Sequence, residues 1–261
     1  MLDFDAIQDW DLQLTEALRG FLPDSFHQQL SDANPENVGS AYDFLYDLSG
    51  LHVIIDQTLS WLASTDIAGY HGSRLTDDEL ASVRTKGLLP LSGNLRRERL
   101  LKVLSVHHDW TVAEARLDEA IGRHSNREGQ VHLMLSRYEV VSGDYRRNLS
   151  NGSEFDQSVA RDLLGQEGVN LLAHYGEYRV LRFRVPGPQA LDAANPFGGV
   201  EDARRRERIP NLVRQVLESW CVRQVQPDSP TQTRHCSMMF QETVPPDWLV
   251  SVESLPNTFA R

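Results

Sequence analysis

The stretch Tyr70–Thr76, with the sequence YHGSRLT, is the segment from which the fold of this chain is best interpreted. It closes a short apolar run and is followed directly by a helix signal. Thr76 and Glu79 have the spacing of a capping box, in which each side chain accepts a hydrogen bond from the backbone N–H of the other residue. Gly87 is of the residue type that commonly ends a helix. We therefore predict a strand end, a polar turn and a helix that begins after Thr76.

The predicted turn carries groups that suit the binding of a polar small molecule. His71 offers an imidazole, Gly72 a backbone that a ligand can approach closely and Ser73 a hydroxyl, while Arg74 extends the polar run. A histidine at a strand end is also a common hydrogen-bonded structural residue. From these residues alone, a binding site and a structural turn are both open interpretations.

Length and composition limit the class of protein. A chain of 261 residues with 40% hydrophobic content can bury the core of one large domain, or of one domain with an appendage. The acidic start of the sequence lacks the basic and apolar regions of a signal peptide, and no apolar run is long enough to span a membrane. We expect a cytoplasmic protein without membrane contact. Cys221 and Cys236 are too few for a disulfide framework and lack metal-ligand spacing, so we expect reduced thiols in packed elements.

The net charge of −11 is concentrated in the first quarter of the chain. Residues 1–66 contain twelve Asp or Glu and one basic residue, Arg19, whereas residues 67–261 contain twenty-five of each sign. Apolar residues at helical spacing in this quarter predict two amphipathic helices joined by a turn-rich segment, 23–40. We predict an acidic helical extension over 1–66 and a body over 67–261. The extension is either a solvated cap on the body or an acidic surface that binds a basic partner or covers a basic groove.

The body alternates helix and strand patterns, which predicts the α+β class. Pro210 is expected to break the longest helical pattern, and the arginines at 204, 205, 206 and 208 are either an exposed helix face or a patch for an anionic substrate. The expected helices are 94–107, 111–123, 155–164 and 201–224, and the expected strands are 131–135, 178–185, 236–243 and 248–252.

Several familiar chemistries lack their signatures in this sequence. No glycine-rich dinucleotide fingerprint, Walker-type phosphate loop, His-Glu-x-x-His pattern, paired Cys-x-x-Cys or Gly-x-Ser-x-Gly elbow occurs. His107, His108 and Asp109 are metal-ligand residue types, but adjacent side chains on one element are expected to point in different directions. We therefore predict a solvated turn between helices there and no metal site.

The sequence from Tyr70 to Thr76, followed by a helix and by GLLPL at residues 87–91, resembles the first motif of ADP-ribosyltransferase-fold proteins of the His-Tyr-Glu class. That class includes the poly(ADP-ribose) polymerases and many bacterial toxin and phage-defence transferases. The resemblance implies that the His71 side chain and the Gly72 backbone bind the ribose and the nicotinamide amide of NAD, with Ser73 and Arg74 beside them.

The second and third motifs of that family have weaker counterparts. The segment GQVHL at residues 129–133, with its polar tail, looks like the strand that leads to the tyrosine stacked on nicotinamide; Tyr138 and Tyr145 are the candidates, and we favour Tyr145. The third motif normally supplies a catalytic glutamate near the start of a late strand, where this chain has other residues. Glu242 and Glu154 are the candidate acids, and a third alternative is that the family's acid is absent.

What the resemblance implies is an ADP-ribosyltransferase-like domain over 67–261 with a split β-sheet core, and an acidic helical N-terminal extension. The implied function is mono-ADP-ribosyl transfer from NAD, the co-substrate, to an unidentified protein or nucleic-acid acceptor. A non-catalytic module that binds NAD or a partner on the same fold, and a toxin or defence enzyme that modifies nucleic acid, are the alternatives.

Overall fold

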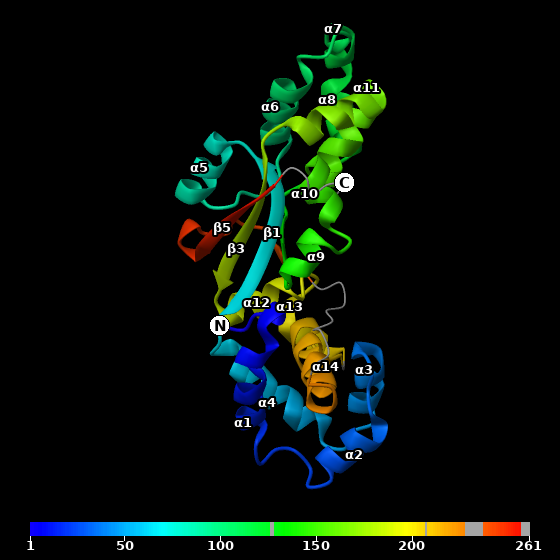
Figure 1. Cartoon of the computed structure of the whole chain (residues 1–261), viewed down its shortest axis with the longest axis vertical. Coiled ribbons are helices and arrows are strands. Elements are labelled where there is room, and N and C mark those ends of the chain that lie inside the picture. Colours follow the sequence, from blue (N-terminus) through cyan, green and yellow to red (C-terminus); the bar gives the residue numbers. More distant parts are fainter. Residues whose placement is uncertain (126–127, 207, 228–236, 257–261) are drawn as a thin grey trace. The chain divides into compact units, whose positions relative to one another are not determined.

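The computed structural model describes residues 1–125, 128–206, 208–227 and 237–256 (Figure 1). Its described residues form α-helices, short 3-10 helices and one five-stranded sheet with the strand order β4-β2-β1-β3-β5. The predicted α+β class is confirmed, while an ADP-ribosyltransferase-like core stays a prediction. Among the described helices, we find none with the length and apolar character needed to cross a membrane.

The first half of the chain is mainly helical. Helices η1 to α4 precede strand β1, and helices α5 to α8 separate β1 from β2. The bounds are η1 (Phe4–Asp9), α1 (Asp11–Leu18), α2 (Phe26–Ala33), α3 (Val38–Tyr46), α4 (Leu51–Ala63), β1 (Ile67–Leu75), α5 (Asp77–Lys86), α6 (Gly93–Leu104), α7 (Trp110–Ala113), η2 (Glu114–Arg116), α8 (Leu117–Arg123) and β2 (Val131–Met134).

The second half carries the remaining three strands of the sheet. Two short helices and one long helix lead to β3, and three helices follow it before β4. The bounds are α9 (Arg137–Val141), α10 (Arg146–Asn151), α11 (Glu154–His174), β3 (Glu177–Val185), α12 (Gly187–Ala193), α13 (Gly199–Arg205), α14 (Asn211–Val225), β4 (Ser237–Phe240), η3 (Pro246–Trp248) and β5 (Leu249–Leu255).

The chain divides into two compact units, each assembled from several segments. The first unit comprises 1–69, 133–136 and 184–239, and the second comprises 70–132, 137–183 and 240–261. Strands β1, β2, β3 and β4 therefore contribute residues to both units. The predicted division between residues 66 and 67 stays a prediction.

In the first unit, the N-terminal helices pack around the largely buried helix α14 (Figure 1). The rings of Phe26 and Trp220 stack with their centroids 5.4 Å apart, and the Trp220 indole N–H donates to the Thr15 hydroxyl at 2.9 Å. Cys221 of α14 is a buried free thiol, as predicted, whereas Cys236 lies outside the described residues. The apolar faces of the acidic helices thus bury aromatic surface against α14.

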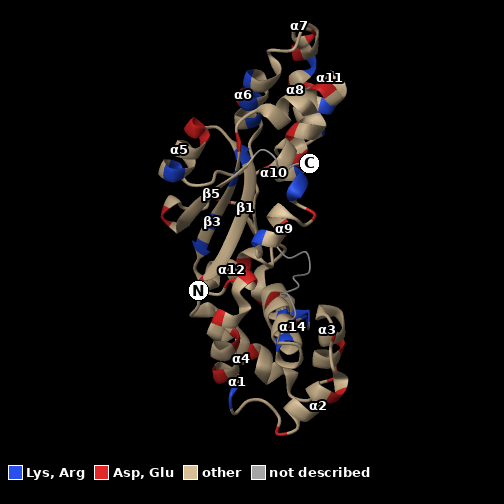
Figure 2. Ribbon diagram, in the orientation of Figure 1, with Lys and Arg blue, Asp and Glu red and all other residues tan. Residues whose placement is uncertain are grey.

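The acidic residues of the segment 1–66 are distributed over several helices, as the red parts of the ribbon in Figure 2 show. Most of them are exposed, because the inward faces of these helices are apolar. Asp11 is an exception that pairs with Arg223 of α14 across 3.6 Å. The predicted helical character of this segment is confirmed, and its role as a cap or as a partner surface stays open.

In the second unit, the junction between β1 and α5 forms as the sequence predicts. The Thr76 hydroxyl accepts from the Glu79 N–H at 3.2 Å, and the Glu79 carboxylate accepts from the Thr76 N–H at 2.8 Å. Gly87 ends α5 with a positive φ of 85°, a conformation that residues with a Cβ rarely adopt. This predicted capping box and helix end are confirmed.

The second unit also contains a separate apolar cluster. Buried residues of α6, α7, α8 and α11 pack together, among them Leu100, Leu117 and Val159. Within α11, Gly165 has a non-helical backbone with φ of 61° and ψ of −145°, so the segment consists of two helical parts. The prediction that the first part ends at Gly165 is confirmed, and the second part, up to His174, was not predicted.

Other expected elements need correction. Residues 23–40 contain α2, and the second predicted N-terminal helix is divided before α4 at Gly50, whose φ is 80°. Helix α12 was not predicted. Pro210 separates α13 from α14 as predicted, and β4 ends at Phe240, earlier than expected.

Candidate functional site

The main correction concerns the polar segment 70–74, which lies in strand β1 and not in a turn. Successive side chains of a strand point to opposite faces, so His71 and Ser73 share one face of β1 while Gly72 and Arg74 belong to the other. His71, Gly72 and Ser73 are half-buried, and Arg74 is only 3% exposed. The strand therefore divides the predicted binding residues between two faces.

The imidazole of His71 is held by the neighbouring strand. Its Nδ1 lies 3.0 Å from the carbonyl oxygen of His132 in β2. A carbonyl only accepts hydrogen bonds, so Nδ1 carries the proton and Nε2 carries the lone pair of the neutral ring. Burial lowers the pKa of His71, because desolvation disfavours the charged ring, and this effect outweighs the opposing hydrogen bond. His71 is thus an oriented, neutral imidazole with Nε2 as its acceptor atom.

Gly72 is required by packing against α9 and α10. A Cβ at this position would lie 2.3 Å from Cγ1 of Val140 and 3.5 Å from Cδ1 of Leu149. A separation of 2.3 Å is far inside van der Waals contact, so no larger residue fits without movement. The close approach that the sequence suggested for a ligand is made, on this face, by the side chain of Val140.

Arg74 is engaged with the chain segment that leads into β3. Its guanidinium donates to the carbonyl oxygens of Tyr175 at 3.0 Å and of Gly176 at 2.6 Å, and it lies over the Tyr178 ring at 4.2 Å. Burial lowers the pKa of Arg74 from its ordinary value. These contacts make Arg74 a structural link between β1 and β3, and its predicted contact with a cofactor stays a prediction.

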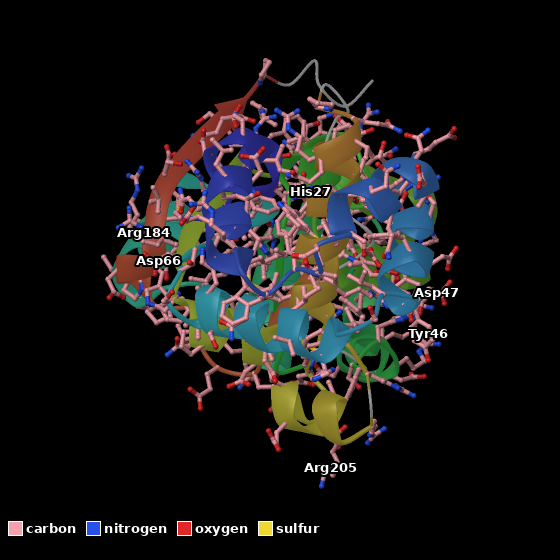
Figure 3. All side chains as sticks on the ribbon, turned by 90° about the horizontal axis from the view of Figure 1, so that it is seen from below. His27, Tyr46, Asp47, Asp66, Arg184 and Arg205 are labelled. Atoms are coloured by element: carbon pink, nitrogen blue, oxygen red, sulfur yellow. The ribbon has the colours of Figure 1, made fainter. Side chains whose placement is uncertain are left out.

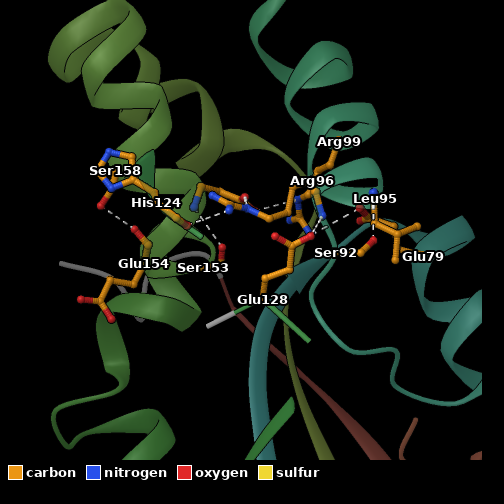
Figure 4. A network of polar contacts seen from close by, with 12 residues as sticks. Glu79, Ser92, Leu95, Arg96, Arg99, His124, Glu128, Ser153, Glu154 and Ser158 are labelled. Atoms are coloured by element: carbon orange, nitrogen blue, oxygen red, sulfur yellow. Dashed lines mark hydrogen bonds and ion pairs between the residues drawn. The ribbon is translucent and has the colours of Figure 1, made fainter. Parts of the chain in front are cut away.

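Arg99 donates to the carbonyl oxygen of Arg74 at 2.7 Å and belongs to a network of buried charges that the sequence did not predict (Figure 4). Arg96 of α6 donates to Asp156 of α11 at 3.3 Å, and both side chains are almost completely buried. Arg99 of α6 lies 4.0 Å from the same carboxylate and 3.4 Å from Glu79 of α5. The network joins the consecutive helices α5 and α6 to α11, which lies about sixty positions further along the chain, and sequence periodicity gives no signal for such pairs.

The two candidate tyrosines lie on the segment that packs against Gly72. Tyr138 belongs to α9 and is 63% exposed, whereas Tyr145 precedes α10 and is half-buried. Val140 and Leu149, which contact the Gly72 position, flank Tyr145 in sequence. The structure therefore brings the tail of the second predicted motif to β1 on the face opposite to the His71 side chain, whereas the strand of that motif, β2, lies beside β1 and bonds to His71.

Both candidate acids are exposed. Glu154 is the first residue of α11, and its neighbour Ser153 caps that helix by accepting from the Asp156 N–H at 3.1 Å. Glu242 lies beyond the end of β4, whereas the expected strand, 236–243, included it. Cys236, at the start of the predicted strand, lies outside the described residues.

Another carboxylate that the sequence analysis missed lies next to the tyrosine segment. Glu253 of β5 accepts two hydrogen bonds from Arg137, the first residue of α9, at 2.8 and 2.7 Å. This pairing lowers the pKa of Glu253. Because β5 pairs antiparallel with β3, with Glu253 opposite Val180, the ion pair links α9 to the edge of the sheet.

The arginine-rich segment after α12 is partly neutralised by its own helix. Arg205 and Arg206 both lie within 2.8 Å of Asp202, and the side chains of both arginines are exposed (Figure 3 labels Arg205). Asp66 and Arg184, also labelled there, form another pair of the first unit at 3.9 Å. This arrangement agrees with an exposed helix face.

The turn between α6 and α7 also differs from expectation. The ligand atoms of His107, His108 and Asp109 lie within 4.8 Å of one another, and the two imidazole rings stack at 4.3 Å. The expectation that these adjacent side chains point in different directions is therefore wrong.

Comparison of the chain with protein-family models, with curated proteins and with solved structures finds no match.

Proposed function

We propose that this protein is an NAD-dependent mono-ADP-ribosyltransferase that acts on a macromolecular acceptor, a protein or a nucleic acid, in the cytoplasm. One observation carries the proposal: His71 of the YHGSR strand is fixed through Nδ1 by the His132 carbonyl. The resemblance of the surrounding residues to the first motif of the His-Tyr-Glu class supplies the identity of the ligand.

The neutral ring of His71 suits a sugar. Its Nε2 can accept a hydrogen bond from a ribose hydroxyl, and lowering of the His71 pKa keeps this acceptor available near neutral pH. In the proposed complex, His71 binds the ribose, the Gly72 backbone meets the nicotinamide amide, and Ser73 lies on the same face of β1 as His71.

The chemistry requires more than a binding site. Loss of nicotinamide creates positive charge on the ribose, as in glycoside hydrolysis, and a carboxylate beside the ring stabilises that charge. Glu242 and Glu154 are the proposed candidates for this role. Each is exposed as described above, so a transferase needs NAD or the acceptor to bury the acid that acts.

The test uses the purified full chain with NAD labelled in its adenylate half. Lysate protein and RNA serve as separate acceptor mixtures, and released nicotinamide reports hydrolysis. We expect label on one acceptor or nicotinamide release, and loss of both in His71→Ala. His52→Ala, which changes an exposed histidine of α4, is the matched control and retains full activity. Absence of both NAD binding and turnover with every acceptor would overturn the proposal.

A second candidate function is a non-catalytic module that binds NAD or a partner. The exposure of both candidate acids favours it, because no structural feature desolvates either carboxylate near β1 in the described residues. Calorimetry distinguishes the two functions. NAD binding that His71→Ala abolishes, without turnover and with unchanged affinity in Glu242→Ala and Glu154→Ala, supports the binding module. Labelled RNA, together with growth inhibition on expression that His71→Ala relieves, supports the toxin or defence enzyme.

A further inference from the structure

A cluster of four metal-ligand side chains joins the α6–α7 turn to α11 in the second unit. His107, His108 and Asp109 have their ligand atoms within 4.8 Å of one another. Glu167 of α11 completes the set, because its Oε2 lies 2.7 Å from Nε2 of His107. Nε2 of His108 lies 3.1 Å from Oδ2 of Asp109. Two imidazoles and one carboxylate thus gather in the α6–α7 turn, and a second carboxylate, about sixty positions further along the chain, contacts one of the two imidazoles.

From this geometry we propose that His107, His108, Asp109 and Glu167 bind one divalent transition-metal ion, for which zinc is the best fit. Two imidazole nitrogens and two carboxylate oxygens form a donor set that zinc accepts in tetrahedral geometry. Calcium and magnesium prefer sets composed of oxygen, so they fit this cluster poorly.

Binding requires a small closure of the cluster. Tetrahedral zinc with bonds of about 2.1 Å separates its ligand atoms by roughly 3.4 Å. The two ligand pairs at 2.7 and 3.1 Å are closer than this and must open slightly to admit the ion, whereas the wider separations must shorten. His108, Asp109 and Glu167 have side chains that are 76%, 67% and 71% exposed, so they can move without disturbing the apolar cluster.

The protons must also rearrange. Nδ1 of His107 accepts the Asp109 N–H at 3.1 Å, so the proton of the neutral ring lies on Nε2 and is shared with Glu167. Zinc takes the place of that proton at Nε2, the proton passes to Nδ1 through solvent, and the Asp109 amide turns away. The N–H bond at Nε2 is thus exchanged for one at Nδ1, the coordinate bonds form, and the metal keeps its oxidation state.

The proposed metal would stabilise a break in a helix. Glu167 follows Gly165, at which α11 changes direction, and Leu163 and Leu172 on either side of the break belong to the same apolar cluster. A metal that joins Glu167 to His107 would hold the second part of α11 against the α6–α7 turn. Binding to the native state alone raises the unfolding temperature.

The test is titration of the full chain with zinc chloride in a buffer that does not chelate metal, followed by calorimetry and by thermal unfolding. We expect one zinc ion per chain, an increased unfolding temperature, and no binding of magnesium or calcium. His108→Ala and Glu167→Gln each remove one exposed ligand. Each is expected to lower the zinc affinity by at least about 100-fold, because loss of a residue that only hydrogen-bonds to a metal ligand already lowers metal affinity by roughly 10- to 100-fold.

His124→Ala is the matched control. His124 forms a similar pair with Asp162 at 2.8 Å, but without a second histidine, so its loss should leave zinc affinity unchanged. Far-ultraviolet circular dichroism of each variant without zinc reports whether it is folded. Absence of zinc binding by the folded parent chain overturns the proposal, as does zinc binding that survives both His108→Ala and Glu167→Gln or is lost in His124→Ala.

Discussion

The interior around α14 in the first unit and the interior around α6 and α11 in the second are buried in different ways. Trp220 of α14 is enclosed by aromatic and apolar side chains, with one hydrogen bond from its indole. Asp156 of α11 is equally enclosed, but beside the guanidinium groups of Arg96 and Arg99. Apolar burial depends on area and tolerates many partners, whereas a buried charge depends on one specific partner.

The largest expected effect is in the first unit. Trp220→Ala removes a fully buried indole, its stacking on Phe26 and its bond to Thr15, and is expected to lower the free energy of unfolding by about 5 kcal/mol. Urea denaturation followed by circular dichroism measures it. Trp220→Phe keeps a ring and should lose markedly less. Equal losses in both variants would show that the hydrogen bond, and not the aromatic packing, supports this interior.

Asp156→Asn tests the charged interior. It leaves the buried Arg96 without its counter-charge, while Arg99 keeps Glu79, and we expect a loss of about 3 kcal/mol, because breaking a buried pair is costly. Urea denaturation again measures the loss. The double variant Arg96→Met with Asp156→Leu removes both members of the closest pair and should recover most of that loss. A double variant less stable than Asp156→Asn would mean that the two interiors do not differ as we describe.

Gly72→Ala separates packing from ligand binding at β1. The new methyl would overlap Val140, so we expect a loss of about 2 kcal/mol from overpacking. Adding Val140→Ala to the same chain makes room for the methyl group. The melting temperature of this double variant should therefore approach that of Val140→Ala alone. If the restored double variant still fails to bind NAD, Gly72 has a role in the ligand site beyond packing. A Gly72→Ala protein of unchanged stability would contradict the steric interpretation.

The smallest expected effect is the pH dependence from His71. Its folded pKa lies below the ordinary value of about 6.5, so the unfolded chain binds this proton first as the pH falls. The stability that His71 contributes is complete above about pH 6.5 and is lost as the pH falls through the folded pKa. Urea denaturation at several pH values between 5 and 8 measures this effect. As the pH falls, the free energy of unfolding should decrease less in His71→Gln than in the parent chain. Identical decreases in the two proteins would show that groups other than His71 cause the pH dependence.

Local chemistry made much of the second unit predictable. The capping box of Thr76 and Glu79, the end of α5 at Gly87 and the end of the first part of α11 at Gly165 all follow from residue type and spacing. These features depend on neighbours within a few residues, so a single sequence contains the whole signal. Helix α12 and the second part of α11 lack comparable capping and spacing signals in the sequence.

The candidate site was less predictable, because its contacts are long-range. The segment from Tyr70 to Arg74 looked like an exposed turn, since its residues are polar. In the structure the strand continues through it: His71 bonds to the carbonyl of His132, and Arg74 bonds to carbonyls about one hundred positions away. The polar residues showed that the segment is unusual. They could not show what buries it, because its hydrogen-bond partners lie in β2 and just before β3.

By itself, the sequence determined the α+β class, the helical and acidic character of residues 1–66 and the capped helix after β1, because composition, periodicity and local hydrogen bonds are written in adjacent residues. The tertiary structure alone decided that His71 and Gly72 belong to opposite faces of a strand, that Arg96 and Arg99 share Asp156, and that His107 meets Glu167. Those contacts depend on which distant segments the folded chain brings within a few ångströms of one another, and local sequence patterns do not predict which segments those are.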